Sequence, residues 1–144
     1  LMVLADGTVF ATVVPAVQRD ILASGGFGAR LVLFMRGSLL DELALRLVAL
    51  PLTIWTIMAL TGRRGSLAAW PAILLVSCVF WPIWASAYMR DLEPSALTLT
   101  REVVLHMGAG TVWGWLCWRH GWLTGLAGHW SAHVALQALL PLTV

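Results

Sequence analysis

Two acidic residues and an arginine interrupt a long apolar stretch at residues 40–46, which reads Leu-Asp-Glu-Leu-Ala-Leu-Arg. A lone charge at the centre of a bilayer costs roughly 2.5 to 3.5 kcal/mol on insertion scales, so charges in such stretches face a polar interior and have partners. In a helix, Glu42 and Arg46 are four residues apart with the acid first, the order that favours an ion pair. The stretch therefore indicates either a structural ion pair or part of a functional site, and both alternatives stay open.

The composition indicates that this stretch belongs to a membrane protein. Of the 144 residues, 60% are hydrophobic and 11% are charged, whereas an average soluble domain is about 45 to 50% apolar. A spanning helix needs roughly 20 residues. We therefore predict an all-α, polytopic bundle of about five transmembrane helices in a single membrane domain of residues 1–144.

The distribution of charge bears on the partners. The nine basic residues are scattered and give a net charge of +2, so we do not expect nucleic acid as a partner. The lipid bilayer is the expected surrounding, and the expected localisation is the cytoplasmic membrane of a bacterium or archaeon. The first apolar stretch contains Asp6 and lacks a basic flank and a cleavage site, so we interpret it as part of a membrane helix in an N-terminally truncated fragment.

Five apolar runs separated by polar turns define the predicted helices. Pro51 is expected to kink the second helix without ending it, because neighbouring membrane helices can satisfy the freed carbonyl. Ser95, Thr98 or Thr100 is expected to cap the fourth helix. The predicted helices cover about 2–17, ended by the polar residues 18–20, then 29–60, 67–88, a fourth run to about 118, and 122–139.

His129 and His133 form the second group of candidate site residues. At positions i and i+4 both imidazoles project from one face of a helix, a geometry that suits a zinc site or two donors to an oxyanion. A hydrogen-bonded structural histidine is the alternative, with Ser131 nearby. The zinc-protease motif His-Glu-x-x-His is absent, because Trp130 follows His129.

In order and spacing these motifs resemble the CPBP family of intramembrane proteases. This family includes the CAAX prenyl endopeptidases and bacteriocin-processing or self-immunity proteins. The resemblance covers residues 40–137, which we predict as the protease core. It rests on Asp41-Glu42-x-x-x-Arg46, Phe80 four residues before Trp84, Gly110-x-x-x-Gly114, a turn at 119–121, and His129-x-x-x-His133.

The resemblance implies roles for individual residues. Asp41, in the first position of the family's acidic pair, would activate water, and His129 and His133 would hold the oxyanion. Glu42 and Arg46 complete the first motif and are predicted as catalytic residues with it. The implied reaction is hydrolysis of a peptide bond in a peptide or protein substrate, of the prenylated or bacteriocin-like kind. No cofactor is expected under the glutamate-dependent mechanism, and zinc is the alternative that earlier descriptions of the family favoured.

Three departures from the family pattern qualify this expectation. Asp41 is one methylene shorter than the family's glutamate, and a displacement of about an ångström can be costly for catalysis. Trp84 replaces the histidine of the second motif, and indole has a donor but no titratable nitrogen. His133 replaces an asparagine and still offers a donor. We also expect His106 to approach the same cavity as an accessory residue.

Two other classes of function stay open. A catalytically impaired member of the family would bind peptides in the membrane or act as an immunity protein. A transporter or proton relay would also explain charged and histidine residues inside spans, but it would predict inverted repeats, and the sequence shows none.

Overall fold

The computed structural model describes residues 2–139. Residues 2–139 are almost entirely helical and contain no strand, which confirms the predicted all-α class. The helices in chain order are α1 (Met2–Gly7), η1 (Ala11–Val13), α2 (Ala16–Ser24), α3 (Phe27–Asp41), η2 (Glu42–Ala49), α4 (Leu50–Thr61), α5 (Ser66–Leu75), η3 (Val76–Phe80), α6 (Trp81–Trp84), α7 (Ser86–Arg90), α8 (Ala96–Arg101), η4 (Glu102–Gly108), α9 (Ala109–His120) and α10 (Trp122–Leu139).

Several of these segments join into longer continuous helices. α3, η2 and α4 form one helix of 35 residues, and α5, η3 and α6 form one of 19 residues. In the described part of the chain these two are long and apolar enough to cross a membrane, judged by length and composition. Pro51 lies in the first turn of α4 without interrupting the long helix, so the prediction that the helix continues through it is confirmed.

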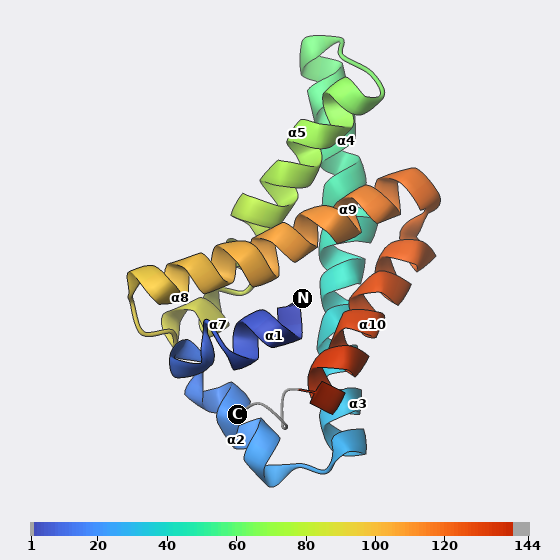
Figure 1. Cartoon of the computed structure of the whole chain (residues 1–144). Helices are drawn as coiled ribbons and strands as arrows, with labels where there is room; N and C mark the ends of the chain where they lie inside the picture. The colour runs from blue at the N-terminus through green and yellow to red at the C-terminus, as the bar shows by residue number, and fades with distance from the viewer. Residues whose placement is uncertain (1, 140–144) are drawn as a thin grey trace.

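The N-terminal region differs from the prediction. Instead of one helix over 2–17, the chain forms α1, the 3₁₀ turn η1 and α2, and the expected terminator at 18–20 lies inside α2. Pro15 is the N-cap of α2 and has an extended backbone, because proline fixes φ and has no N–H to continue a preceding helix. In Figure 1, α1 lies in the space between α8 and α9 on one side and α10 on the other.

The third predicted helix, residues 67–88, is wrong at its end, because the long helix stops at Trp84 and α7 begins after a turn at Ala85. The other helix boundaries agree with the sequence prediction to within about two residues. The side chain of Ser95 accepts a hydrogen bond from the backbone N–H of Thr98, so Ser95 is the cap of the fourth helix. Gly121 has a positive φ of 94° and makes the sharp turn between α9 and α10. As Figure 1 shows, α10 then runs back beside α3 and η2.

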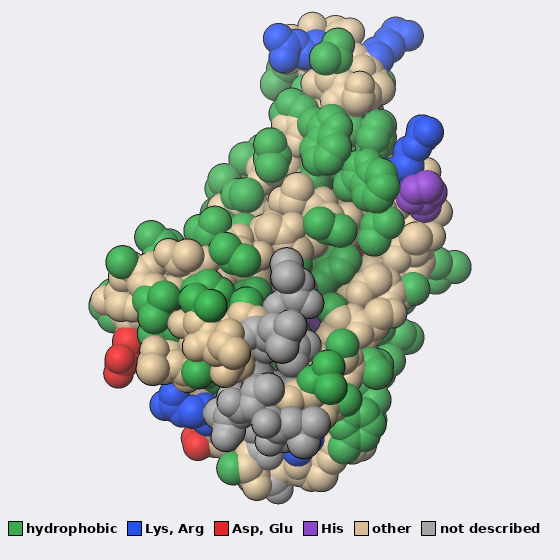
Figure 2. Space-filling model, viewed as in Figure 1, with side chains coloured by type: hydrophobic (Ala, Val, Ile, Leu, Met, Phe, Trp, Pro, Cys, Tyr) green, Lys and Arg blue, Asp and Glu red, His purple; other side chains and the backbone are tan. Residues whose placement is uncertain are grey.

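The apolar residues fall into a small core and a large exposed surface. The core is built by five buried residues of η2, α4, α5 and η3, namely Leu45, Leu50, Ala72, Ile73 and Val76. Many large apolar side chains are exposed, among them Trp55 and Leu60 of α4. Figure 2 shows hydrophobic side chains over much of the visible face and basic ones at the tip, which is the turn that carries Arg63 and Arg64. Such an extensive exposed apolar surface is typical of contact with lipid or another partner.

Candidate functional site

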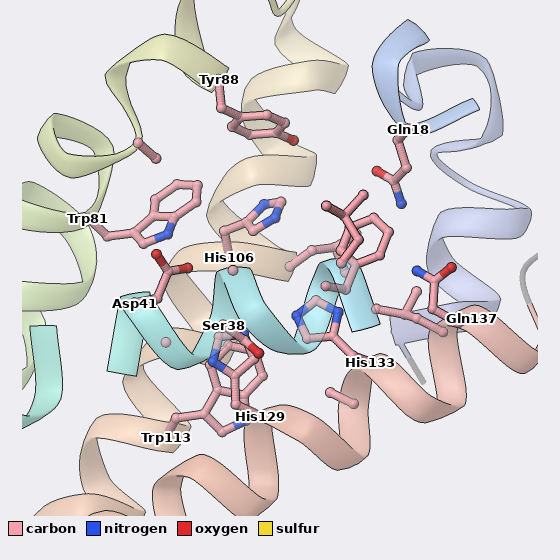
Figure 3. A pocket seen from close by; sticks show the side chains of 18 of the residues that line it. Gln18, Ser38, Asp41, Trp81, Tyr88, His106, Trp113, His129, His133 and Gln137 are labelled. Carbon is pink, nitrogen blue, oxygen red and sulfur yellow. The ribbon is translucent and has the colours of Figure 1, made fainter. Parts of the chain in front are cut away.

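A cavity of about 500 Å³ lies inside the helical bundle. Its lining includes Asp41, His106, His129 and His133, which come from three separate helices. Figure 3 shows the labelled side chains gathered around this space. Residues from the second, fourth and last predicted helices therefore meet in one place.

Glu42 lies behind the cavity wall and holds His129. Its side chain is fully buried, it is not among the residues that line the cavity, and its Oε1 lies 2.9 Å from Nδ1 of His129. An Nδ1–H that donates to this carboxylate fixes the orientation of the ring and leaves Nε2 as its second functional atom. Of the two adjacent acids, Asp41 faces the cavity and Glu42 positions a histidine.

Arg46 connects this pair to α9. Its Nε lies 4.0 Å from Oε1 of Glu42, and its Nη2 donates a 3.0 Å hydrogen bond to the carbonyl oxygen of Gly110. The expected pairing between Glu42 and Arg46 is therefore present at ion-pair distance, without a hydrogen bond at Nε. Glycine is needed at 110, since an added Cβ would lie 2.8 Å from Nη2 of Arg46.

This close approach gives a first prediction. Gly110→Ala should lower the free energy of unfolding by about 1 to 3 kcal/mol, the usual cost of overpacking, because the added Cβ displaces Nη2 of the buried Arg46 from its hydrogen bond to the carbonyl oxygen of Gly110. Thermal unfolding in detergent measures the effect. Gly108→Ala is the matched control, because its Cβ would meet only a carbonyl oxygen at 3.4 Å. Equal melting temperatures for both variants would contradict the inferred packing.

Asp41 is contacted by Trp84, the residue that replaces the histidine of the family's second motif. Nε1 of Trp84 donates a 2.8 Å hydrogen bond to Oδ1 of Asp41, although 53% of the Trp84 residue surface is exposed. Asp41 accepts no other side-chain hydrogen bond from the described residues, which leaves its second oxygen able to accept a proton. Trp84 thus supplies a donor to the first acid but no group that can exchange a proton with it.

Four aromatic rings form a stacked column along one wall of the cavity. The ring centroids are 3.9 Å apart between Trp113 and His129, 5.0 Å between His129 and His133, and 5.3 Å between His133 and Phe34. The interplanar angle between the two histidines is 24°. Nδ1 of His133 is buried and has no hydrogen-bond partner within the described residues.

This geometry does not suit a zinc site. Two histidines that bind one ion direct a nitrogen each at the same point, whereas these imidazoles lie face to face and one nitrogen of His129 is already in contact with Glu42. Within residues 2–139 no three Asp, Glu, His or Cys side chains are placed to hold a metal ion. We therefore derive no step that uses zinc.

A second polar cluster lies at the same cavity, and of its members only His106 was expected there from the sequence. Arg101 is bonded to Asp6 of α1 and to Glu102, and Nδ1 of His106 lies 2.6 Å from Oε2 of Glu102. The His106 ring also stacks on Trp81 at 4.7 Å. The signals that could have found this cluster were the adjacent charges Arg101 and Glu102, which open the fourth apolar run, and the isolated Asp6 in the first.

The comparisons with known proteins assign no family. No protein-family model matches this chain, and neither a curated protein nor a solved structure is significantly similar to it.

Proposed function

We propose that this protein is an intramembrane endopeptidase of the CPBP type, with residues 40–137 as its catalytic core. The observation that carries the proposal is that Asp41, His129 and His133 line one cavity. These are the residues on which the sequence motifs place the water-activating acid and the oxyanion donors. The hydrogen bond from Trp84 to Asp41 supports it further, since the second motif of the family belongs beside the first acid.

The proposal includes a membrane arrangement. Four helical stretches, at residues 27–61, 66–84, 96–120 and 122–139, cross the bilayer, and their exposed apolar side chains face lipid. The N-terminal α1 and α2 do not span. This proposed arrangement has four spans, one fewer than the sequence prediction, because the chain breaks at Gly7 and Pro15 and leaves α1 and α2 short.

The proposed reaction uses the carboxylate of Asp41 as the general base. Asp41 removes a proton from water as the water oxygen bonds to the carbonyl carbon of the peptide, and the electron pair of the C=O bond moves to oxygen. In its protonated form, His129 donates from Nδ1 to Glu42 and from Nε2 to this oxyanion, with His133 as a second donor. When the tetrahedral intermediate collapses, the C–N bond breaks and Asp41 returns the proton to the leaving nitrogen.

The direct test is hydrolysis of model peptides by the purified chain in liposomes. Prenylated and unprenylated peptides are incubated in H₂¹⁸O, and the products are analysed by mass spectrometry. We expect one ¹⁸O atom in the newly formed carboxyl group after a single turnover. Metal analysis of the same preparation, together with cleavage in the presence of a chelator, tests the zinc alternative. Absence of cleavage for every peptide would contradict the proposal.

Substitutions at Trp84 test whether its hydrogen bond supports the base. Trp84→Phe keeps an aromatic ring but removes the donor to Asp41, so we expect peptide turnover to fall by about tenfold, the effect of roughly 1.4 kcal/mol. Trp84→His restores the residue type of the family motif and should raise turnover above that of the unmodified protein. Steady-state rates on one peptide measure both effects.

The second candidate function is a membrane protein that binds peptides without cleaving them. The observation that favours it is the same replacement, because Trp84 lacks the titratable nitrogen that the family motif places beside the acid. If turnover stays undetectable in Trp84→His, in Asp41→Glu and in the two combined, while peptides still bind, this alternative replaces the protease proposal.

A further inference from the structure

The side chain of Arg101 holds a carboxylate that comes from a distant part of the chain. Its Nε and Nη2 donate to the two oxygens of Asp6, over 2.6 and 3.0 Å. Both residues are buried, with exposed fractions of 2% and 1%, and both line the cavity that contains Asp41 and His133. Two parallel N–H···O bonds are the geometry in which a guanidinium recognises a carboxylate group.

The guanidinium also donates hydrogen bonds to three other side chains. Nη1 donates to Oε1 of Glu102 over 2.7 Å and to the hydroxyl of Tyr88 over 3.2 Å, and Nη2 also donates to Oε1 of Gln18 over 3.1 Å. Glu102 follows Arg101 directly in the same helix, so this carboxylate stays with the arginine. Asp6, in contrast, is supplied by α1, a helix of six residues.

Gln137 gives independent evidence that this end of the cavity accepts a ligand. Its side chain is 1% exposed and lines the same cavity, and its Oε1 has no hydrogen-bond partner within the described residues. A buried amide oxygen without a donor is costly. Figure 3 shows the Gln137 side chain at the rim of the space that Gln18, Tyr88 and His133 also face.

We propose that Arg101 is a carboxylate-binding subsite for the substrate and that Asp6 occupies it when no substrate is bound. This inference rests on the proposed function. A carboxylate of the peptide, either its C-terminus or an Asp or Glu side chain, replaces Asp6 on Nε and Nη2, and an N–H of the same peptide donates to Oε1 of Gln137. The exchange replaces one carboxylate by another, so the buried arginine keeps its compensating charge throughout.

The exchange also explains why α1 is placed in the bundle. While Asp6 is bound to Arg101, this short helix contributes a side chain to the lining of the cavity. A substrate without a carboxylate displaces Asp6 less favourably than one that has a carboxylate. Arg101 would then be buried without the negative charge of Asp6 or of a replacement. The subsite therefore favours acidic or carboxyl-terminal peptides over neutral ones.

The test measures binding separately from cleavage. The full chain in nanodiscs is titrated with three versions of one apolar labelled peptide, which carry a free carboxyl end, an amide end, or an amide end with one internal Glu. We expect at least one carboxylate peptide to bind tenfold or more tightly than the neutral peptide, and the tighter of the two identifies the source of the carboxylate. Asp6→Asn should tighten binding of that peptide by a further tenfold and tighten binding of the neutral peptide by less, because only the carboxylate peptide pairs with the freed Arg101.

Removal of Arg101 together with Asp6 should abolish the preference for carboxylate peptides over the neutral peptide. The double variant Asp6→Asn, Arg101→Gln is expected to bind all three peptides equally, whereas Arg90→Gln, which alters an exposed arginine, keeps the preference. If the double variant does not fold, as judged by its helical circular dichroism, the Asp6→Asn titration decides alone. Equal affinities of the three peptides for the unmodified chain and for Asp6→Asn would overturn the inference.

Failure of this inference can be told apart from failure of the protease proposal. Peptides that bind through their carboxylate but are never cut would support the subsite and contradict the peptidase. Cleavage that is indifferent to the carboxylate would contradict the subsite and leave the peptidase in place.

Discussion

Asp41→Asn should abolish peptide cleavage, with kcat reduced by about 10²- to 10⁴-fold, the usual contribution of general base catalysis. Asparagine has nearly the same size, and its amide oxygen can still accept the hydrogen bond that Trp84 donates to Asp41. An amide cannot take a proton from water, so the chemical step is lost while the packing is preserved. Single-turnover rates and thermal unfolding, measured on the same preparation, separate the two effects.

The control for this variant is Asp91→Asn, which removes a carboxylate from an exposed turn. It should cleave peptides at the normal rate. If Asp41→Asn retains cleavage, Asp41 is not the base, and the binding function becomes the better account of the cavity. If it loses both activity and its unfolding transition, Asp41→Ser, which also lacks a carboxylate, provides a second variant to measure.

Most helices of this fold could be predicted from the sequence because each is a long apolar run that ends at glycine or at charged residues. The N-terminal region could not be predicted in this way, because residues 2–17 form one apolar run in the sequence although Gly7 and Pro15 interrupt the helix. Its position depends on the ion pair between Asp6 and Arg101, two residues far apart in the chain. No local pattern reveals a partner at that separation.

The members of the candidate site were predictable from the motifs, but the position of Glu42 behind the cavity wall was not. The spacing of the motifs selected Asp41, Glu42, His129 and His133, and the structure places all four at or directly behind one cavity wall. Adjacent residues on a helix point about 100° apart, so the sequence could not tell which acid faces the cavity. The backbone is π-helical from Glu42 to Ala49, and such turns shift the phase of the side chains.

Glu42→Leu should destabilise the fold by about 3 to 5 kcal/mol, because it leaves Arg46 buried without a compensating charge. The double variant Glu42→Leu, Arg46→Leu removes both charges and should recover most of this loss, as replacement of buried ion pairs by apolar residues often does. Chemical unfolding in detergent measures both. Exchange of the two residues is a poorer test, because Arg46 also donates to Gly110 and Glu42 also contacts His129, and neither contact survives an exchange.

Activity separates the structural and functional interpretations of this pair. If Glu42 serves only the ion pair, the double leucine variant should regain cleavage together with stability. We expect it to regain stability alone, since His129 then lacks the carboxylate that fixes its ring, and the loss of an oxyanion donor of this kind costs about 10²- to 10³-fold in kcat. A stable and fully active double variant would show that Glu42 and Arg46 form a structural pair, and that His129 is held in place by its stacking on Trp113 and His133.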